Sequence, residues 1–418
     1  MDHPVKLRLS DDLERTRVTV LFRLVLAIPL VVWLYLWGIV AVAVTILNWF
    51  ATLATGTPWR AAHDFASRFV RFAVHVYAYV GLLADPYPGF GGNPGYAVDV
   101  ELPEPAPQNR WTVLFRVPLA LPAMLLGGAL ATGFWYRVDD QFTQIGGLLT
   151  VVAFLSWFAI LARSRMPRGL RDAGAYGLLY GAQTWAYLLL LTDRYPNSDP
   201  QAALPELPAD EHPIRLDVED DRRRGRATTF FRLLLAIPHF AWLVIWGLAA
   251  YAGVIVSWLI QVVAGRPSPG LHRFISTYLR YATHVYAYTY LIADPYPEFD
   301  GRAGAYPVEL TLPEPARQDR LTVAFRLVLA VPAFALASTY AGVAIVAAFL
   351  GWFAVLATGR MPLGLRNALA LWLRYNQQAA GYLLLLTERY PHSGPTAEGP
   401  PAAPTPPVWL TPDPFAMS

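Results

Sequence analysis

The chain has 418 residues, of which 55% are hydrophobic, 14% aromatic and only 15% charged, with a formal net charge of +3. Soluble domains average about a quarter charged residues, so this composition and the mean hydropathy of +0.34 favour a chain that is partly surrounded by lipid. The absence of cysteine excludes disulfides, thiolate metal sites and a cysteine nucleophile. Because the N-terminal segment is polar and charged, we expect no cleavable signal peptide.

The stretch FRLVLAIP at 22–29 recurs as FRVPLALP at 115–122, FRLLLAIP at 231–238 and FRLVLAVP at 325–332. Each copy is followed by a tryptophan-containing apolar run, an arginine-rich turn, another helical segment and a YP dipeptide. Such self-similarity predicts repeated structural units, and the likeness of unit one to three and of two to four predicts two duplicated halves. The predicted repeats are 1–96, 97–196, 212–305 and 306–391, with a linker at 197–211 and a disordered proline-rich tail at 392–418.

Every unit opens with a short segment in which apolar and polar residues alternate. These segments are PVKLRL from residue 4, AVDVELP from 97, PIRLDV from 213 and PVELTLP from 307. Alternation with a period of two predicts a strand with one buried face. Because isolated strands are unstable, we expect the four strands to form one small sheet on one side of the membrane.

The apolar segment at 17–55 would span about 58 Å as a straight helix, about twice the ~30 Å hydrocarbon core of a bilayer. Between Pro122 and Trp157, unit two has fifteen residues more than the other units, including the charged stretch 136–144. A charged loop is incompatible with hydrocarbon, so we predict four helical hairpins. The alternative is a proline-bent interfacial helix followed by one long span. The predicted hairpin arms in unit two are 116–135 and 145–163, and the turns elsewhere lie near Gly38, Gly247 and Gly342.

The helical segment after each predicted hairpin is amphipathic, with polar residues at helical spacing on one face. Such a helix suits the membrane interface, where arginines meet anionic lipid headgroups. Nearly all arginines then fall on one side, and the positive-inside rule places that side and both termini in the cytoplasm. The predicted headgroup-facing residues are Arg60, Arg68, Arg71, Arg168, Arg171, Arg273, Arg280, Arg366 and Arg374.

The arginine of each FR motif lies about one turn inside the first apolar run, close enough to reach the interface. An acidic residue ends the last helix of each unit at the same level. We predict one ion pair per unit that holds helix ends together, in preference to a role in ion or substrate passage. The predicted pairs are Arg23 with Asp85, Arg116 with Asp193, Arg232 with Asp294, and Arg326 with Glu388.

Other candidate sites are weak. His63 and His75 recur as His272 and His284, but a spacing of twelve does not align them on a helix as metal ligands. Asp139 and Asp140 suit a solvated turn. Because no phosphate-binding loop or catalytic motif is present, we expect no enzyme, no cofactor, no metal and no nucleic-acid partner.

Four motifs together resemble a bacterial, actinobacterial-type membrane family known only as domain of unknown function 4389. They are LAIPH at 235–239, WFAILA at 157–162, ATGRMP at 357–362 and LLTDRYP at 190–196. Units one and three depart from this pattern, with DPYP in place of DRYP and altered turns. The resemblance implies a multi-pass protein of the bacterial plasma membrane and supplies no catalytic residue.

From residues and resemblance together we expect a mainly α integral membrane protein that is not an enzyme. Its expected role is that of a scaffold, an accessory subunit or a lipid-interacting protein whose arginine-rich face meets anionic lipid. A membrane-protein partner or a second copy of the chain remains open. The alternative is a transporter or channel with a path between the two duplicated halves.

Overall fold

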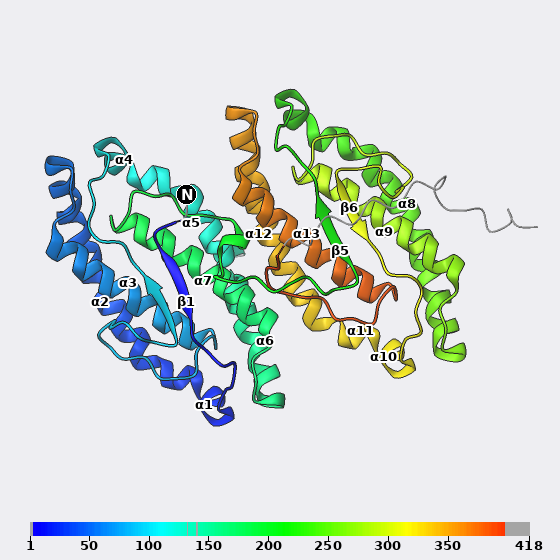
Figure 1. Ribbon diagram of the computed structural model, residues 1–418, viewed down its shortest axis with the longest axis horizontal. Helices are drawn as coiled ribbons and strands as arrows, with labels where there is room; N and C mark the ends of the chain where they lie inside the picture. Colours follow the sequence, from blue (N-terminus) through cyan, green and yellow to red (C-terminus); the bar gives the residue numbers. More distant parts are fainter. Residues whose placement is uncertain (1–2, 132, 139–140, 398–418) are drawn as a thin grey trace, which may run out of the picture.

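The computed structural model describes residues 3–131, 133–138 and 141–397, and the described chain is mainly helical, as predicted (Figure 1). Unit one comprises β1 (Lys6–Leu9), α1 (Arg17–Leu21), α2 (Arg23–Thr55) and α3 (Arg60–Val80). Unit two comprises β2 (Val98–Glu101), α4 (Arg110–Leu114), α5 (Arg116–Leu130), β3 (Phe134–Val138), β4 (Gln141–Ile145), α6 (Leu148–Arg163) and α7 (Arg168–Leu188).

The second half repeats this order after the short 3-10 helix η1 (Pro200–Ala202). Unit three comprises β5 (Arg215–Val218), α8 (Arg226–Ala264) and α9 (Pro269–Thr289). Unit four comprises β6 (Val308–Thr311), α10 (Arg320–Ala324), α11 (Arg326–Leu329), α12 (Val331–Thr358) and α13 (Leu363–Leu383).

The hairpin prediction is wrong for units one, three and four, in which one continuous helix runs through each predicted turn. Gly38, Gly247 and Gly342 lie inside α2, α8 and α12. A single glycine costs a helix only about 1 kcal/mol, whereas a turn there would leave backbone groups unpaired among apolar side chains. The helices end instead at glycines with positive φ: Gly56 (80°), Gly265 (69°) and Gly359 (70°).

Unit two has two helices, but they form one interrupted helix and not a hairpin. Both α5 and α6 pack along α7, and the chain leaves and re-enters the helix at nearly the same point. A Cβ on Gly147 would lie 2.5 Å from the Gly133 nitrogen and 2.6 Å from the Ala131 oxygen. The insertion therefore projects from the helix as the antiparallel pair β3 and β4. Asp139 and Asp140 lie outside the described residues.

Deleting residues 132–146 should join α5 and α6 into one continuous helix like α12, because the deletion removes fifteen residues between points already in contact. We expect circular dichroism at 222 nm and the thermal midpoint to stay close to those of the parent chain. A matched deletion of 336–350 inside α12 should abolish cooperative melting. Equal damage by the two deletions would contradict the interrupted-helix description.

A strand lies at each of the four predicted positions, but the prediction of one shared sheet is wrong. β1 pairs with β2, antiparallel, and β5 pairs in the same way with β6, so each half has its own two-stranded sheet. The halves meet through α12, which packs against α5 and α6. That contact places helices between the two sheets and keeps the four strands from meeting.

The amphipathic helices form the middle of the fold and not its surface, in contrast to their predicted interfacial position. Each packs between an apolar helix and a strand: α3 between α2 and β2, α7 between α5–α6 and β1, α9 between α8 and β6, and α13 between α12 and β5. Most of their residues are buried. Their polar side chains therefore face the strands and loops of the protein as well as solvent.

Within each half, the two units pack reciprocally through the ends of their apolar helices. Trp49 Nε1 donates to the Val113 carbonyl at 2.7 Å, and Trp157 Nε1 donates to the Val20 carbonyl at 3.2 Å. Trp258 and Trp352 do the same with Val323 and Thr229 in the second half. The apolar helices of a half therefore run antiparallel, and α2 and α8 lie at opposite ends of the molecule (Figure 1).

The predicted linker and the start of the predicted tail are ordered and join the two halves. Tyr176 donates to the Ser198 carbonyl at 2.8 Å, and Asn367 donates to Asp199 at 2.9 Å. At the chain end, Ser393 is the equivalent of Ser198, and its carbonyl accepts a hydrogen bond from Tyr340. The predicted tail boundary at 392 is therefore wrong for 392–397, and residues 398–418 lie outside the described chain.

Candidate functional site

The FR arginine is buried in every unit, where it stacks on a tyrosine. Arg23, Arg116, Arg232 and Arg326 are each 2% exposed, and each guanidinium carbon lies 4.1 to 4.4 Å from a ring centroid. These contacts are cation–π interactions. The tyrosines are Tyr79, Tyr187, Tyr288 and Tyr382. Sequence reasoning missed them, although each lies six residues before the acidic residue of its unit.

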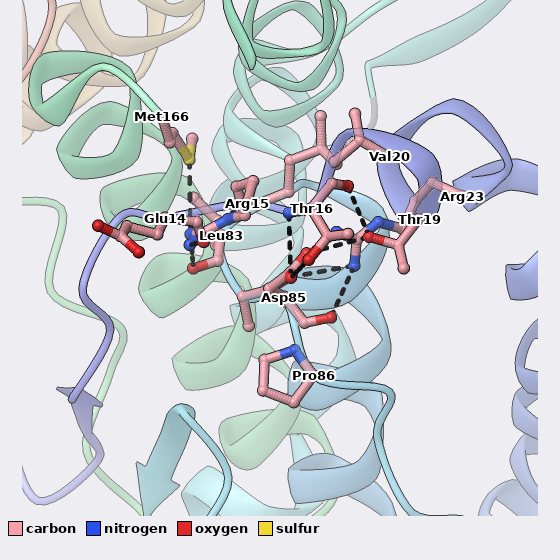
Figure 2. A network of polar contacts seen from close by, with 12 residues as sticks. Glu14, Arg15, Thr16, Thr19, Val20, Arg23, Leu83, Asp85, Pro86 and Met166 are labelled. Carbon is pink, nitrogen blue, oxygen red and sulfur yellow. Dashed lines mark hydrogen bonds and ion pairs between the residues drawn. The ribbon is translucent and has the colours of Figure 1, made fainter. Parts of the chain in front are cut away.

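The structure brings together the predicted ion pair in units one and three. Arg23 Nη2 lies 2.8 Å from Asp85 Oδ1 (Figure 2), and Arg23 Nη1 donates to the Ala84 carbonyl at 3.2 Å. Arg232 pairs with Asp294 in the same way. Asp85 also accepts a bond from the backbone nitrogen of Thr16, so each pair links the start of an apolar helix to the end of an amphipathic helix.

In units two and four the predicted carboxylate partner is wrong. Arg116 donates to Gln108 and to the Thr192 carbonyl, where Asp193 was expected. Arg326 donates to Gln318 and to the Thr387 carbonyl, where Glu388 was expected. The glutamine occupies the position beside the guanidinium, while Asp193 and Glu388 lie exposed in solvent.

The glutamine marks a second repeated position, eight residues before each FR arginine. It is Arg15 in unit one, Gln108 in unit two, Arg224 in unit three and Gln318 in unit four. Each side chain donates to the carbonyl of a leucine in the left-handed conformation that follows the amphipathic helix. These leucines are Leu82, Leu190, Leu291 and Leu385, with φ of 62° or 63°.

Arg15 is the most enclosed of these donors. Its guanidinium makes two bonds to Asp11, at 2.8 and 2.7 Å, and the side chains are 0% and 4% exposed. It also donates to the Leu82 carbonyl at 3.0 Å and to the Leu83 carbonyl at 2.8 Å (Figure 2). Two carboxylate oxygens and two helix-end carbonyls thus satisfy one buried cation, which gives this arginine a structural role.

The predicted headgroup face is smaller than expected. Arg60, Arg68, Arg168 and Arg273 are exposed, whereas half-buried Arg71, Arg171 and Arg280 pair with Asp99, Asp172 and Glu309. The prediction is wrong for Arg366 and Arg374, which are only 8% and 7% exposed. Both face the ordered linker and chain end, where Arg374 lies 3.5 Å from Asp210 and bonds to Gly394.

The histidines act as packing and hydrogen-bonding groups. His75 Nε2 lies 3.0 Å from Asp99, His272 bonds to the Pro313 carbonyl and His239 bonds to the Tyr281 hydroxyl. Within the described residues, no group of three or more histidine, aspartate or glutamate side chains is arranged to hold a metal ion.

His392 supplies a test of pH dependence. Burial lowers the pKa of His392 to about 4, and the positive charge of the nearby Arg374 is the second cause. The unfolded chain therefore takes up a proton on this histidine near pH 6.5, whereas the folded chain does so only near pH 4. His392 thus makes its full contribution to the free energy of unfolding above about pH 6.5, and this contribution falls as the pH is lowered toward 4. Asn197 is the equivalent of His392 in the first half. The backbone nitrogen of His392 donates to Gln378, and that of Asn197 donates to Gln183.

We therefore expect the thermal midpoint of the His392→Asn variant to fall less between pH 7 and pH 5 than that of the parent chain. The backbone bond is retained in this variant, so the two midpoints should be close at pH 7. An identical fall in the two proteins would assign the acid sensitivity to other groups.

An extended apolar surface follows the long helices. On α2, Leu24, Tyr35 and Leu47 are 75%, 72% and 63% exposed, whereas Asn48 and Thr52 of the same helix are buried. On α8, leucines and valines face outward and Gln261 faces inward. This reversal of the usual soluble pattern is typical of a lipid-facing helix. Three described helices, α2, α8 and α12, are long and apolar enough to cross a membrane.

The chain matches the family described as domain of unknown function (DUF4389) over residues 17–91, 141–198, 226–300 and 320–393. No curated protein and no solved structure matches it significantly. Three matches begin where the first helix of a unit begins, and the match in unit two begins inside the insertion that interrupts its helix. Because the matches cover more than half of the chain, it belongs to the DUF4389 family and carries four copies of its domain, as its motifs predict.

Proposed function

We propose that this protein is a non-enzymatic, lipid-interacting scaffold whose long apolar helices lie along one leaflet of a membrane. The observation that carries the proposal is an apolar surface that is longer than a bilayer is thick. Leu233 and Val263 of α8 are 69% and 75% exposed, and thirty residues of helix separate them by about 45 Å, against a hydrocarbon core of ~30 Å.

The groups beside the long helices support the same orientation. Near the middle of α2, Trp37 contacts Phe69 of α3, and Trp33 Nε1 donates to the Phe90 carbonyl in an exposed loop. Arg68, next to Phe69, is exposed. If α2 crossed the bilayer, this arginine and this loop would lie at the depth of the hydrocarbon, where unpaired polar groups cost several kcal/mol each. A flat orientation leaves them in water.

The arrangement of the long helices is also flat. α2, α6, α8 and α12 run across the view in Figure 1, which looks down the shortest axis of the molecule. Apolar helices in one layer, beneath amphipathic helices and strands, fit insertion to the depth of the headgroup and acyl boundary. Exposed arginines beside that layer, such as Arg60 and Arg273, would each add about 1 kcal/mol of attraction to an anionic surface.

A bacterial plasma membrane, entered from the cytoplasmic side, is the location that we propose, because its inner leaflet presents anionic lipid to these arginines. Embedding in one leaflet takes the place of the multi-pass arrangement expected from the sequence. The predicted hairpin kept both ends of α1–α2 on the cytoplasmic side with Gly38 outside, but α2 is continuous through Gly38. A continuous helix that crossed the bilayer would have its two ends on opposite sides, whereas in our arrangement they lie on the same side.

The test uses the natural absence of cysteine. Single-cysteine variants Arg17→Cys and Thr57→Cys bracket α1–α2, and Leu36→Cys marks its middle. In sealed proteoliposomes with a uniform protein orientation, a membrane-impermeant thiol reagent should reach both end positions from the same side and leave Leu36→Cys unlabelled. Labelling of the two ends from opposite sides would establish a crossing helix and refute the proposal.

A further inference from the structure

We infer that the groove between the two halves binds one anionic diacyl phospholipid, an inference that rests on the proposed membrane embedding. The groove has a volume of about 1220 Å³ and lies between α6 and the start of α12, with the linker and the chain end at its rim. Typical small-molecule pockets measure about 300–1,000 Å³, so the groove has room for an elongated ligand with apolar chains.

The walls of the groove are apolar and continuous with the proposed lipid-facing surface. Phe154 and Phe158 of α6 are 61% and 53% exposed, and Val331 of α12 is 61% exposed. Ala159 and Ala335 also line the groove, and their small side chains leave the space between the aromatic rings open. An acyl chain that entered here would leave the bilayer without crossing a polar surface.

The rim of the groove carries arginines. Arg163, Arg168 and Arg389 are all exposed there, and among the described residues no carboxylate lies within 4 Å of the Arg163 or Arg389 guanidinium. Arg168 lies 3.9 Å from Asp172, which is held more closely by Arg171 at 2.6 Å. A guanidinium group binds phosphate oxygens through two parallel bonds, so this rim suits a phosphodiester headgroup.

Two carboxylates also line the rim and reduce its positive charge. Asp210 lies 3.5 Å from the buried Arg374, so this arginine balances its charge. Glu211 is exposed. Three arginines therefore face one unbalanced carboxylate, and the rim keeps a net positive charge that suits an anionic headgroup better than a zwitterionic one.

The internal repeat shows that two of the three rim arginines are specific to this groove. Residues 195 positions later are the equivalents in the second half: Phe349 and Phe353 repeat the aromatic walls, but Thr358 and Leu363 stand where Arg163 and Arg168 would be. The third rim arginine, Arg389, has Arg194 as its equivalent. Packing at the positions of Arg163 and Arg168 therefore does not require a cation. A ligand that contacts this groove, and not the equivalent position in the second half, explains the difference.

The experiment titrates the delipidated full chain, in a neutral detergent, with dioleoyl phosphatidylglycerol or dioleoyl phosphatidylcholine and counts bound lipid by native mass spectrometry. We expect one tight lipid and about tenfold tighter binding of phosphatidylglycerol. The double variant Arg163→Gln with Arg389→Gln should lose this preference. The matched control, Arg266→Gln with Arg317→Gln, removes the same charge from exposed positions outside the groove and should keep it.

Two further measurements separate binding of the acyl chains from binding of the phosphate headgroup. Filling the groove with Ala335→Trp should reduce binding of both lipids, and glycerol phosphate at equal concentration should not displace the bound lipid, because the acyl chains hold it. Displacement by glycerol phosphate, or equal losses in the groove and control variants, would overturn the inference. Flotation of the parent chain with phosphatidylglycerol liposomes is the separate test of membrane embedding, so a failure of the groove alone is distinguishable.

Discussion

Replacement of Arg15 by methionine is expected to lower the free energy of unfolding by about 3–5 kcal/mol. Methionine fills a similar volume but leaves Asp11, only 4% exposed, without its cation, and removes the donor to the Leu82 and Leu83 carbonyls. Removing one partner of a buried ion pair costs this much because the other charge stays buried and unpaired. Denaturant unfolding in a mild detergent, followed by tryptophan fluorescence, measures the change.

Controls for this prediction come from the chain itself. Arg17→Met removes an exposed arginine that bonds to the Ala162 carbonyl and should cost under about 1 kcal/mol. The double variant Asp11→Asn with Arg15→Gln copies unit two, where Gln108 alone donates to the Leu190 carbonyl at 2.7 Å. It should be more stable than Arg15→Gln alone. If the double variant is the less stable of the two, the buried charge of Asp11 is not the source of the loss.

The second large effect is expected for Gly177→Ala, with a loss of about 1–3 kcal/mol through overpacking. A Cβ at this position would lie 2.5 Å from the Leu130 oxygen of α5, a backbone atom that yields only if α5 and α7 separate. One turn later, Gly181 has no atom within 4 Å of such a Cβ. Gly181→Ala should therefore gain up to about 1 kcal/mol from helix propensity, and thermal melts of the two variants compare neighbouring sites on one helix. Similar midpoints would refute the close approach of the two helices.

The features of the fold that could be predicted from sequence are those with a strong period. The FR motif recurs four times, so the four repeats and the positions of the strands could be predicted, and Arg23 and Asp85 were correctly identified as partners. The aligned spacing also carried a signal that went unused: Tyr79 and its equivalents have a fixed place in every unit. A repeated aromatic residue near a repeated buried cation is a usable indication of a cation–π contact.

The remaining features depend on contacts between distant segments. Units one and two both carry an acidic residue at the same position, and they differ eight residues before the FR arginine, where unit two has Gln108 and unit one has Arg15. Only the fold, which places Gln108 beside the guanidinium of Arg116, shows that this difference decides the partner. The hairpins failed for a related reason: the insertion in unit two shows where the chain tolerates extra residues, not where a helix reverses. Strand pairing likewise followed from the packing of each half, which local alternation does not encode.

The reciprocal contacts within a half determine the smallest part of this protein that could be duplicated or transferred to another gene by itself. One repeat has a strand without a partner and a tryptophan whose acceptor belongs to the neighbouring repeat, so it is half of a closed structure. Two repeats satisfy both needs. Growth by gene duplication would therefore proceed in steps of two repeats, and a chain with a single repeat would need a second copy of itself to supply the missing strand.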